Sequence, residues 1–315
     1  MPQQKWSVSA DGGFLANPRI SEKLRYASQP LMKFRQFVRP EPGFGKKKGD
    51  TLLFDRISNV AAAGRIISEL EKMPETNVSI SQGSLVIDEY GNSIPWTGKL
   101  EDLAEFDVEN IWLRTLRDDA AKTLDGAVGD EFQTAQVKYT PTGTDALPTS
   151  VFDTDGTVST AALRHIQAFD VKEIVDQMKS VYFVPFYDGE NYMAIVSVKF
   201  GRKLKDDPDW EDAAKYGDPE RLFSGEIGRY YGVRFVEETN VLANLMGGSA
   251  FNGEAIFLGQ DPVIEGIVVP LEMRAKIPTD YGRDKGLAWY FMGGWQVTYA
   301  SALAGEIKMV HVTST

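Results

Sequence analysis

Two short stretches carry residue types that bind phosphate or calcium in other proteins, and neither has the spacing that this chemistry needs. The stretch 43–50 (GFGKKKGD) is rich in glycine and lysine, but it lacks the GxxxxGKS or GxxxxGKT order of a phosphate-binding loop. Asp153, Asp155 and Gly156 resemble the start of a calcium loop, yet the closing glutamate at the required distance is missing. We interpret the first stretch as a loop that leads into a strand and the second as a polar turn.

The remaining candidates for catalysis also lack partners. Ser249 follows two glycines, but the second glycine of a nucleophile elbow is absent. The chain has only two histidines, His165 and His311, and both are interpreted as structural. The acidic run 206–212 is interpreted as the solvated start of a helix, because acidic side chains favour helix N-termini. The chain has no cysteine, which excludes thiolate zinc sites and cysteine nucleophiles. The sequence therefore predicts a protein that is not an enzyme and needs no cofactor or metal.

Charge is divided unevenly along the 315 residues. The net charge is −11, but residues 1–50 contain ten Lys or Arg against four Asp or Glu, so the rest of the chain is strongly acidic. This division predicts that the basic part lies on acidic surface of a neighbouring molecule or faces a polyanion, with a solvated tail as the alternative. No apolar run of membrane-spanning length and no signal-type N-terminus occur, so we expect a soluble protein made in a cytoplasm.

The first hundred residues indicate extended structure. Residues 1–45 show no apolar period and are punctuated by Gly and Pro, so we expect an arm that is ordered only against another surface. Alternating residues indicate strands at 50–57, 77–81 and 84–88, and a turn is expected at 90–93. Together they predict two antiparallel strands that project a loop. A two-stranded ribbon is marginal in water by itself, so it needs a partner surface.

A long helix is predicted over about 103–135, starting at Asp102 or Asp107. Apolar residues recur every three or four positions, which places on one stripe Leu103, Phe106, Leu113, Leu116, Ala120, Leu124, Val128 and Phe132. A helix of that length spans about 45 Å. Gly126 and Gly129 weaken its second half.

The remainder of the chain mixes helices and strands. We expect a polar loop at 138–158, a helix over 160–178 and a helical stretch near 210–216. Strands are expected at 192–198, 233–237, 255–258, 266–269, 292–300 and 307–312. Because helices and strands do not alternate regularly, the predicted class is α+β rather than a parallel α/β array.

The order of these elements resembles that of the major capsid proteins of tailed bacteriophages, which have the Hong Kong 97-type fold. Residues 48–56 (KGDTLLFDR) look like the entry to the extended loop in a podophage-type branch of that family, and Leu124-Asp125 fits the late part of its long helix. Residues 225–237 (GEIGRYYGVRFVE) are similar to the family's short helix leading into a strand of the central domain. The resemblance covers about residues 45–315.

The resemblance implies four parts, which are an N-terminal arm, an extended two-stranded loop, a peripheral domain with the long spine helix, and an axial domain. The boundaries that we expect are 1–45 for the arm, 46–98 for the extended loop, 99–180 with 286–315 for the peripheral domain, and 181–285 for the axial domain.

The resemblance also implies a function. The chain is expected to be a major capsid protein that self-assembles into the icosahedral head shell around the double-stranded DNA of a tailed phage. The implied partners are copies of the chain in pentamers and hexamers, with a separate scaffolding protein and a portal during assembly in the host cytoplasm. Contact with packaged DNA is expected to be non-specific at most, and no membrane is involved. An encapsulin-like nanocompartment shell and another virion structural protein are the alternatives.

Two sets of residues are candidates for roles in assembly. The candidate interface residues are the basic ones at and before the loop entry, namely Arg35, Arg39, Lys46, Lys47, Lys48 and Arg56. A shell that places one chain in fivefold and sixfold rings needs flexible joints, which glycine readily supplies. The hinge candidates are Gly49, Gly91, Gly98, Gly126 and Gly129.

Overall fold

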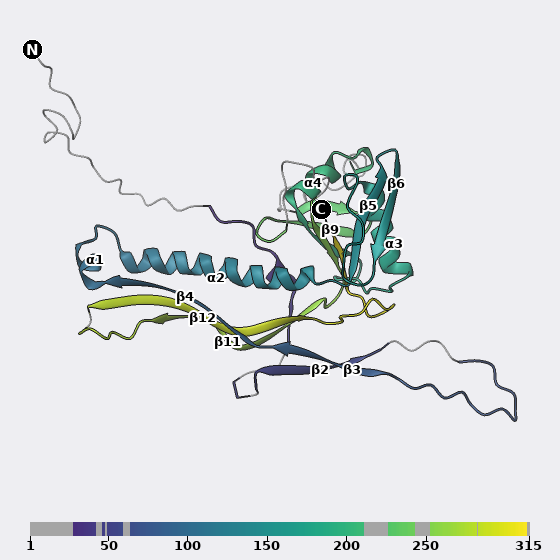
Figure 1. The fold of residues 1–315 in the computed structure, drawn as a ribbon, viewed down its shortest axis with the longest axis horizontal. Helices are drawn as coiled ribbons and strands as arrows, with labels where there is room; N and C mark the ends of the chain where they lie inside the picture. Colours follow the sequence, from purple (N-terminus) through teal and green to yellow (C-terminus); the bar gives the residue numbers. More distant parts are fainter. Residues whose placement is uncertain are drawn as a thin grey trace, which may run out of the picture.

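A computed structural model of the chain describes residues 28–41, 46–47, 49–58, 64–210, 226–242, 253–281 and 283–313. The main elements of this part of the chain are two sheets, a long helix, several shorter helices and a projecting ribbon (Figure 1). The predicted helical stretch near 210–216 and most of the predicted arm lie outside the described residues.

The longest element is helix α2 (Val108–Gln133), which lies along a four-stranded sheet of order β1-β11-β12-β4 (Figure 1). The strands of this spine sheet are β1 (Arg39–Pro40), β4 (Asp88–Thr97), β11 (Val263–Ala275) and β12 (Asp284–Val297). Short helix α1 (Gly98–Leu103) connects β4 to α2. The Asp107 side chain accepts the backbone N–H of Asn110 and caps α2, which confirms the second of the two predicted start positions.

The predicted apolar stripe of α2 is confirmed from its second turn onward. Its buried members pack into one cluster with aromatic side chains of β12, and they are Leu116, Ala120, Leu124, Val128 and Phe132. Leu103 lies before the helix and is exposed. The stripe therefore positions α2 on the spine sheet by apolar burial along one face.

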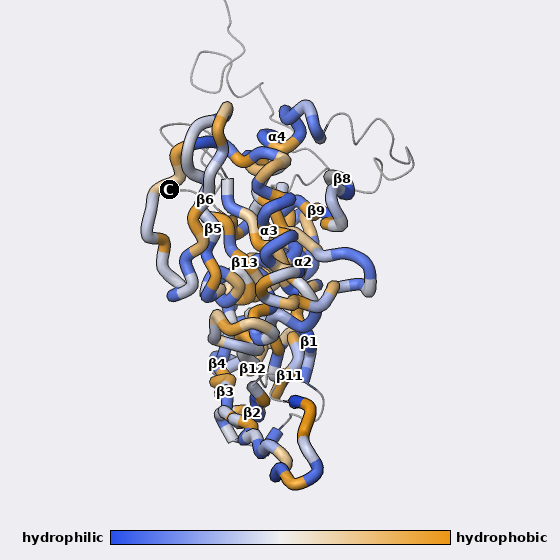
Figure 2. The backbone as a smooth tube through the Cα atoms, turned by 90° about the vertical axis from the view of Figure 1, so that its right-hand side faces the viewer, coloured by the Kyte–Doolittle hydropathy of each residue, from blue (hydrophilic) through white to orange (hydrophobic). Residues whose placement is uncertain are grey.

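A seven-stranded mixed sheet forms the larger body, with strand order β6-β5-β13-β10-β7-β9-β8. Its strands are β5 (Val137–Thr144), β6 (Leu147–Asp153), β7 (Tyr192–Ser197), β8 (Glu226–Tyr230), β9 (Val233–Glu238), β10 (Ala255–Leu258) and β13 (Met309–Val312). Helices α3 (Ala168–Ser180) and α4 (Val198–Lys205) belong to this body. In the side view, the body lies above the spine sheet (Figure 2).

The central strands of this sheet are buried on both faces. Ala194 and Val196 of β7 belong to the cluster that includes α3, whereas Met193 and Ile195 belong to the cluster that includes α2. All four residues of β10 are buried in the same alternating way. Burial on both faces explains why these strands are nearly continuous apolar runs rather than alternating ones.

The ribbon consists of β2 (Thr51–Ile57) and β3 (Ile80–Val86), paired antiparallel from Thr51 opposite Val86 to Ile57 opposite Ile80. It projects beyond the spine sheet, as Figure 1 shows. The predicted pairing of two antiparallel strands that carry a loop is confirmed. We name residues 49–58 and 64–86 the ribbon arm, and residues 64–79 its tip.

Two predicted loops are wrong because long-range strand pairing overrides local turn signals. Residues 90–93 lie inside β4, where Tyr90 pairs with Phe291 of β12. The predicted polar loop 138–158 is mostly the β5–β6 hairpin. Pro141 is compatible with β5 because it lies beyond Val137–Tyr139, the part that pairs with β13, so its missing N–H costs no bond to that strand.

The predicted helix over 160–178 begins later, and a predicted short helix is a strand. In a longer helix, the backbone N–H of Gln167 would donate to the carbonyl of residue 163. It donates instead to the Asp170 carboxylate, as at a helix start. Helix α3 therefore begins at Ala168. Residues 226–230, predicted to belong to a short helix, form β8, which pairs antiparallel with β9.

The sheets group the chain differently from the expected domain boundaries. Strands β5 and β6, expected in the peripheral domain, belong to the seven-stranded sheet. Strand β11, expected in the axial domain, belongs to the spine sheet beside β12 and β4. The mixed helix and strand content agrees with the predicted α+β class.

Candidate assembly surfaces

The ribbon arm has one face on its own chain. Leu85 is fully buried at the base of the arm, where it lies against Gly266 and Gly294 of the spine sheet. A Cβ atom at Gly294 would overlap the carbonyl oxygen of Val86, so only glycine permits this close approach. The base of the arm is therefore fixed by backbone contact with β12.

The outer face of the arm has no partner within the described chain. Its apolar members are Leu53, Ile57, Ile80 and Val86, with exposed fractions between 55% and 66%. They alternate with Asp55 and Gln82, which hydrogen-bond to each other across the strands at 3.0 Å. Single apolar side chains are common on protein surfaces, but several on one element indicate a surface that binds a partner.

The tip is more exposed still. Ile66 and Leu70 are 99% and 100% exposed, and Met73 is also exposed. Two ion pairs lie within the tip, Arg65–Glu71 and Lys72–Glu75. The tip thus presents five exposed apolar side chains, of which Ile66, Leu70 and Met73 are the most exposed.

Arg56, a predicted interface residue, holds the arm to its own body. Its guanidinium donates to the carbonyl oxygen of Val297 at 3.0 Å and lies 4.8 Å from the centre of the Phe54 ring. Burial lowers the pKa of Arg56 below its usual value. The contact joins the arm to the end of β12.

The N-terminal segment, residues 28–41, also lies on its own chain. Phe34, in the short 3-10 helix η2 (Phe34–Phe37), is fully buried with its ring centre 5.5 Å from that of Phe132 in α2. The Asp125 carboxylate of α2 accepts the backbone N–H of Arg35, and burial raises the pKa of Asp125. Strand β1 then pairs in parallel with β11. This part of the expected arm is a component of the fold.

Arg35 and Arg39 form ion pairs inside the chain. Arg35 donates to Glu265 at 3.1 Å and 3.2 Å, and its guanidinium lies 5.2 Å from the centre of the Phe291 ring. Arg39 pairs with Asp261. Both acidic partners belong to the acidic part of the chain. The basic residues Arg35 and Arg39 therefore lie on acidic surface of their own chain rather than on a neighbouring molecule.

The remaining candidates are dispersed. Lys46 and Lys47 are exposed at a turn, and Lys48 lies outside the described residues. Gly49 has a φ of 93°, a conformation that favours glycine. Gly91 pairs with Tyr290 inside the spine sheet, and Gly98 is the first residue of α1.

The two glycines in α2 have different surroundings. A Cβ at Gly126 would meet nothing within 4 Å, whereas one at Gly129 would lie 2.7 Å from a methyl group of Val241. Gly129 is therefore explained by packing against the chain segment that follows β9. The hinge role of all five glycines stays a prediction.

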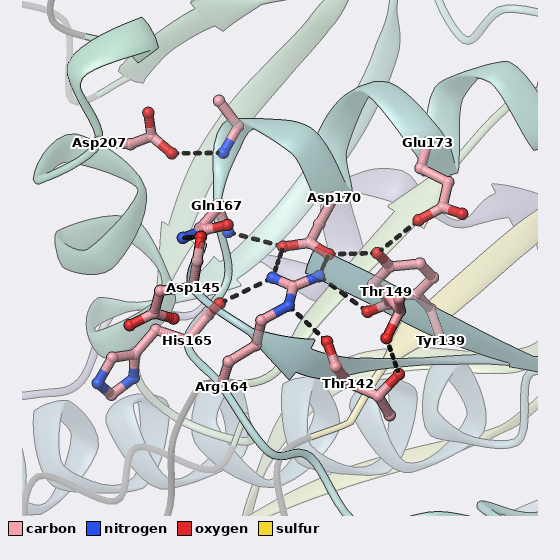
Figure 3. Close-up of polar contacts among 11 residues, drawn as sticks. Tyr139, Thr142, Asp145, Thr149, Arg164, His165, Gln167, Asp170, Glu173 and Asp207 are labelled. Carbon is pink, nitrogen blue, oxygen red and sulfur yellow. Dashed lines mark hydrogen bonds and ion pairs between the residues drawn. The ribbon is translucent and has the colours of Figure 1, made fainter. Parts of the chain in front are cut away.

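A buried ionic network joins α3 to the β5–β6 hairpin, and sequence reasoning did not identify it (Figure 3). Arg164 is 2% exposed and donates from two nitrogens to the two carboxylate oxygens of Asp170. It also donates to the backbone carbonyls of Thr142 and Thr149 at 2.7 Å and 3.0 Å. The Tyr139 hydroxyl donates to the same carboxylate. No local signal distinguishes Arg164 from the solvated arginines of an amphipathic helix.

One of the two histidines, His311, lies inside the seven-stranded sheet. His311 is buried in β13, where its Nδ1 lies 2.9 Å from the ammonium nitrogen of Lys138. Burial is the larger cause and the positive charge of Lys138 the smaller one of a shift that lowers the pKa of His311 to about 3. Lys138 also donates to the carbonyl of Gln133 at 2.6 Å, so the pair ties two strands to the end of α2. In the described ranges, no three His, Cys, Asp or Glu residues are grouped to hold a metal ion.

No helix in the part of the chain that the structure describes is long and apolar enough to cross a bilayer. Exposed apolar side chains are concentrated on the outer face and the tip of the ribbon arm, and single ones occur on other elements of the described chain. This arrangement suits contact between protein surfaces rather than chemistry on a small molecule.

Comparison with known proteins identifies a family. A family model described as phage capsid protein matches residues 83–304, which is more than half of the chain. No curated protein matches.

Solved capsid structures share the fold over nearly the whole chain. A structure from Mycobacterium phage Che8 matches with a TM-score of 0.66 at 13% identity, covering 94% of this chain and 96% of that one. The capsid of Ralstonia phage GP4 matches with a TM-score of 0.64 at 16% identity, covering 98% and 97%. The head structure of Helicobacter pylori bacteriophage KHP40 matches with a TM-score of 0.66 at 9% identity, covering 99% and 98%. At these identities the likeness shows the fold.

Proposed function

The chain belongs to the phage capsid protein family, and from this premise we propose that the ribbon arm joins copies of it into the closed head shell of a tailed phage. As the major capsid protein it contacts other copies of the same chain. The proposal includes the finer partners expected from the sequence, which are pentamers and hexamers of the chain, a separate scaffolding protein, a portal and packaged double-stranded DNA. It also includes assembly in the host cytoplasm.

One observation carries the proposal. The ribbon arm projects from the spine sheet with its apolar outer face and tip uncovered by its own chain. A two-stranded ribbon needs burial on a larger surface to be stable, and a neighbouring copy supplies that surface in an assembly of one chain. The contact is heterologous, because the arm of one copy meets a different surface of the next. Such contacts close into rings when the rotation between neighbours is right.

The structure also suggests how the four expected parts divide the work. We assign the peripheral role to α2 with the spine sheet, and the axial role to the seven-stranded sheet with α3 and α4. The N-terminal segment 28–41 then serves as a brace on α2, and residues 1–27 remain the candidates for an arm that reaches a neighbour or a polyanion.

The decisive experiment removes the apolar side chains of the tip. The full chain, purified and concentrated, is expected to form pentamers, hexamers or spherical particles by size-exclusion chromatography and negative-stain electron microscopy. The triple variant Ile66→Ser, Leu70→Ser, Met73→Ser is expected to remain folded by circular dichroism and to lose these assemblies. The matched control is Thr76→Ser with Asn77→Ser, which changes two exposed polar residues of the same tip and leaves assembly intact.

Three results would contradict the proposal. Normal particles from the triple variant would show that the apolar side chains of the tip do not hold copies together. A wild-type chain that stays monomeric at high concentration, with and without a scaffolding protein, would count against a shell. Tubes, or binding only to preformed heads, would assign the chain to a tail or decoration role.

A further inference from the structure

Three segments that are far apart in the sequence meet at the second half of α2. They are α2 itself, the N-terminal segment 28–41, which crosses α2 near its C-terminal end (Figure 1), and residues 238–242, which end β9 and follow it. The Leu31 N–H donates to the Thr239 hydroxyl at 2.8 Å, and the Thr239 N–H donates to the Leu31 carbonyl at 3.1 Å. The N-terminal segment is therefore held by the end of β9 as well as by α2.

Two buried carboxylates lie at this junction. Asp125 of α2 is 3% exposed, and Glu238 at the end of β9 is fully buried. Asp125 accepts the backbone N–H of Arg35 at 3.3 Å and the side-chain amide of Asn240 at 3.4 Å. Glu238 accepts the backbone N–H groups of Asn240 and Val241. We name Asp125 and Glu238 the carboxylate clamp, which Asn240 bridges by bonding to both acids.

No cation compensates the carboxylate clamp within the described part of the chain. The donors to its oxygens there are backbone N–H groups and the Asn240 amide. The Arg35 guanidinium bonds to Glu265 instead. The charged residues that adjoin the clamp are Lys33 and Arg35 of the N-terminal segment, Lys122 of α2, and Glu237 beside Glu238. The clamp thus places two acids of like charge in a buried site.

Burial raises the pKa of both acids. For Asp125 burial is the largest cause, and the hydrogen bonds from the Arg35 backbone and the Asn240 amide oppose it. For Glu238 burial is again the largest cause, and the negative charge of Asp125 adds to it. If the N-terminal segment leaves α2, water reaches Asp125 and its pKa returns toward the usual value. The docked segment therefore favours proton binding more than the released one does.

The hydrogen bonds at this junction do not require charge. The side-chain carbonyl of Asn at position 125, or of Gln at position 238, could accept N–H groups at the same places. A buried charge without a cation costs stability that a neutral amide does not cost. Carboxylates are therefore the less stable choice at neutral pH. What they add is a response to protons.

We propose that the carboxylate clamp couples docking of the N-terminal segment on α2 to proton uptake, so that the segment is held more tightly as the pH falls from neutral. The inference concerns a single chain and does not depend on the proposed assembly. Residues 1–27 precede the docked segment, so the clamp sets the point from which they leave α2. The gain is complete below the ordinary pKa values of 3.8 and 4.5 and is lost as the pH rises through the raised values.

Hydrogen exchange of the unassembled full chain, followed by mass spectrometry at about pH 8 and about pH 5.5, tests the proposal. Each exchange rate is divided into the rate of an unstructured chain at the same pH, which gives a protection factor. In the wild type, protection of residues 31–37 is expected to rise roughly tenfold at the lower pH, the equivalent of about one pKa unit. The double variant Asp125→Asn, Glu238→Gln is expected to lose this rise.

Two controls isolate the carboxylate clamp. Asp118→Asn makes the same chemical change two turns earlier in α2 and is expected to keep the full response. Protection of β7, which is buried in the seven-stranded sheet, reports global unfolding in the same samples. A rise of equal size in β7 would assign the effect to global stability and overturn the inference.

Other outcomes also overturn it. Protection of residues 31–37 that stays constant or falls at the lower pH in the wild type would exclude proton uptake on docking. A full rise in the double variant would assign the response to other groups. If the double variant does not fold, Asp125→Asn and Glu238→Gln are measured separately, and a full response in both would exclude the clamp. None of these results touches the proposed function, which particle formation by the tip variant tests.

Discussion

The seven-stranded sheet and the ribbon arm are both built from β-strands, but they differ in how many of their faces the chain itself covers. Strands β7 and β10 are buried on both faces, between α3 and the end of α2. Strands β2 and β3 are partly covered on one face only, and the tip that they carry is largely exposed. Under the proposed function, stability resides in the strands of the sheet and assembly in those of the arm. Side chains of the sheet are expected to control unfolding, and those of the arm are expected to control association.

The largest effect on stability is expected at Phe257, in the centre of the sheet. Phe257→Ala removes a fully buried ring that packs on Phe200 and Phe235, so the free energy of unfolding is expected to fall by about 4 kcal/mol. Urea unfolding of the unassembled wild type and variant measures this difference in the free energy of unfolding. A loss below about 1 kcal/mol would mean that the strand tolerates a large cavity and that the contrast with the arm is weak.

The buried ionic network is expected to rank next. Arg164→Met keeps the length of the side chain but leaves the buried Asp170 carboxylate without its cation, which is expected to cost about 3 kcal/mol. The double variant Arg164→Met, Asp170→Asn removes the unpaired charge and serves as the control. Recovery of part of the lost stability in the double variant, measured by the same unfolding experiment, would confirm that the uncompensated charge causes the loss.

The pH dependence of the sheet is expected to reflect His311. Burial lowers its pKa from 6.5 to about 3, so between these values the unfolded chain binds a proton that the folded chain does not. The contribution of His311 to stability is therefore complete above about pH 6.5 and decreases as the pH falls, by about 2 kcal/mol at pH 5. Unfolding measured at pH 7 and pH 5 is expected to show this loss in the wild type and a smaller one in His311→Gln. Equal losses in both proteins would assign the pH effect to other groups.

A smaller effect is expected at the base of the arm. Gly294→Ala places a Cβ against the carbonyl oxygen of Val86, so the backbone must shift, at a cost of about 1 kcal/mol. Because the shift displaces the arm, we expect assembly to suffer more than stability. Particle formation and Tm are measured on the same preparation, and a variant with reduced stability but normal particles would contradict the division between arm and sheet.

The smallest effect on stability is expected at the tip. Leu70→Ser changes a residue that is 100% exposed, so the free energy of unfolding is expected to change by less than about 0.5 kcal/mol. Differential scanning calorimetry of unassembled protein tests this value. A large loss would show that the tip packs on its own chain, which would end the contrast between the two regions.

Local patterns in the sequence were sufficient for part of this fold. The stripe in α2 and the alternation in the ribbon arm repeat over many residues, and periodicity of that kind depends only on neighbours along the chain. The cap at Asp107 is equally local. The family resemblance rested on the order of these elements, and the phage capsid family model confirms it.

Other features were decided by residues far away in the chain. Strand β4 continues through 90–93 because β12, two hundred residues later, supplies its hydrogen bonds. Arg164 is buried because Asp170 and two carbonyls of the β5–β6 hairpin meet it. Arg35 and Arg39 fold back on Glu265 and Asp261, whereas their charge in the sequence suggested a neighbour or a polyanion.

The sequence by itself determined which stretches form the spine helix and the ribbon, since periodicity and capping are local properties. Only the tertiary structure decided which faces of those elements remain uncovered. Burial depends on which distant segments meet, and the covered faces became core while the uncovered ones became candidate surfaces for assembly.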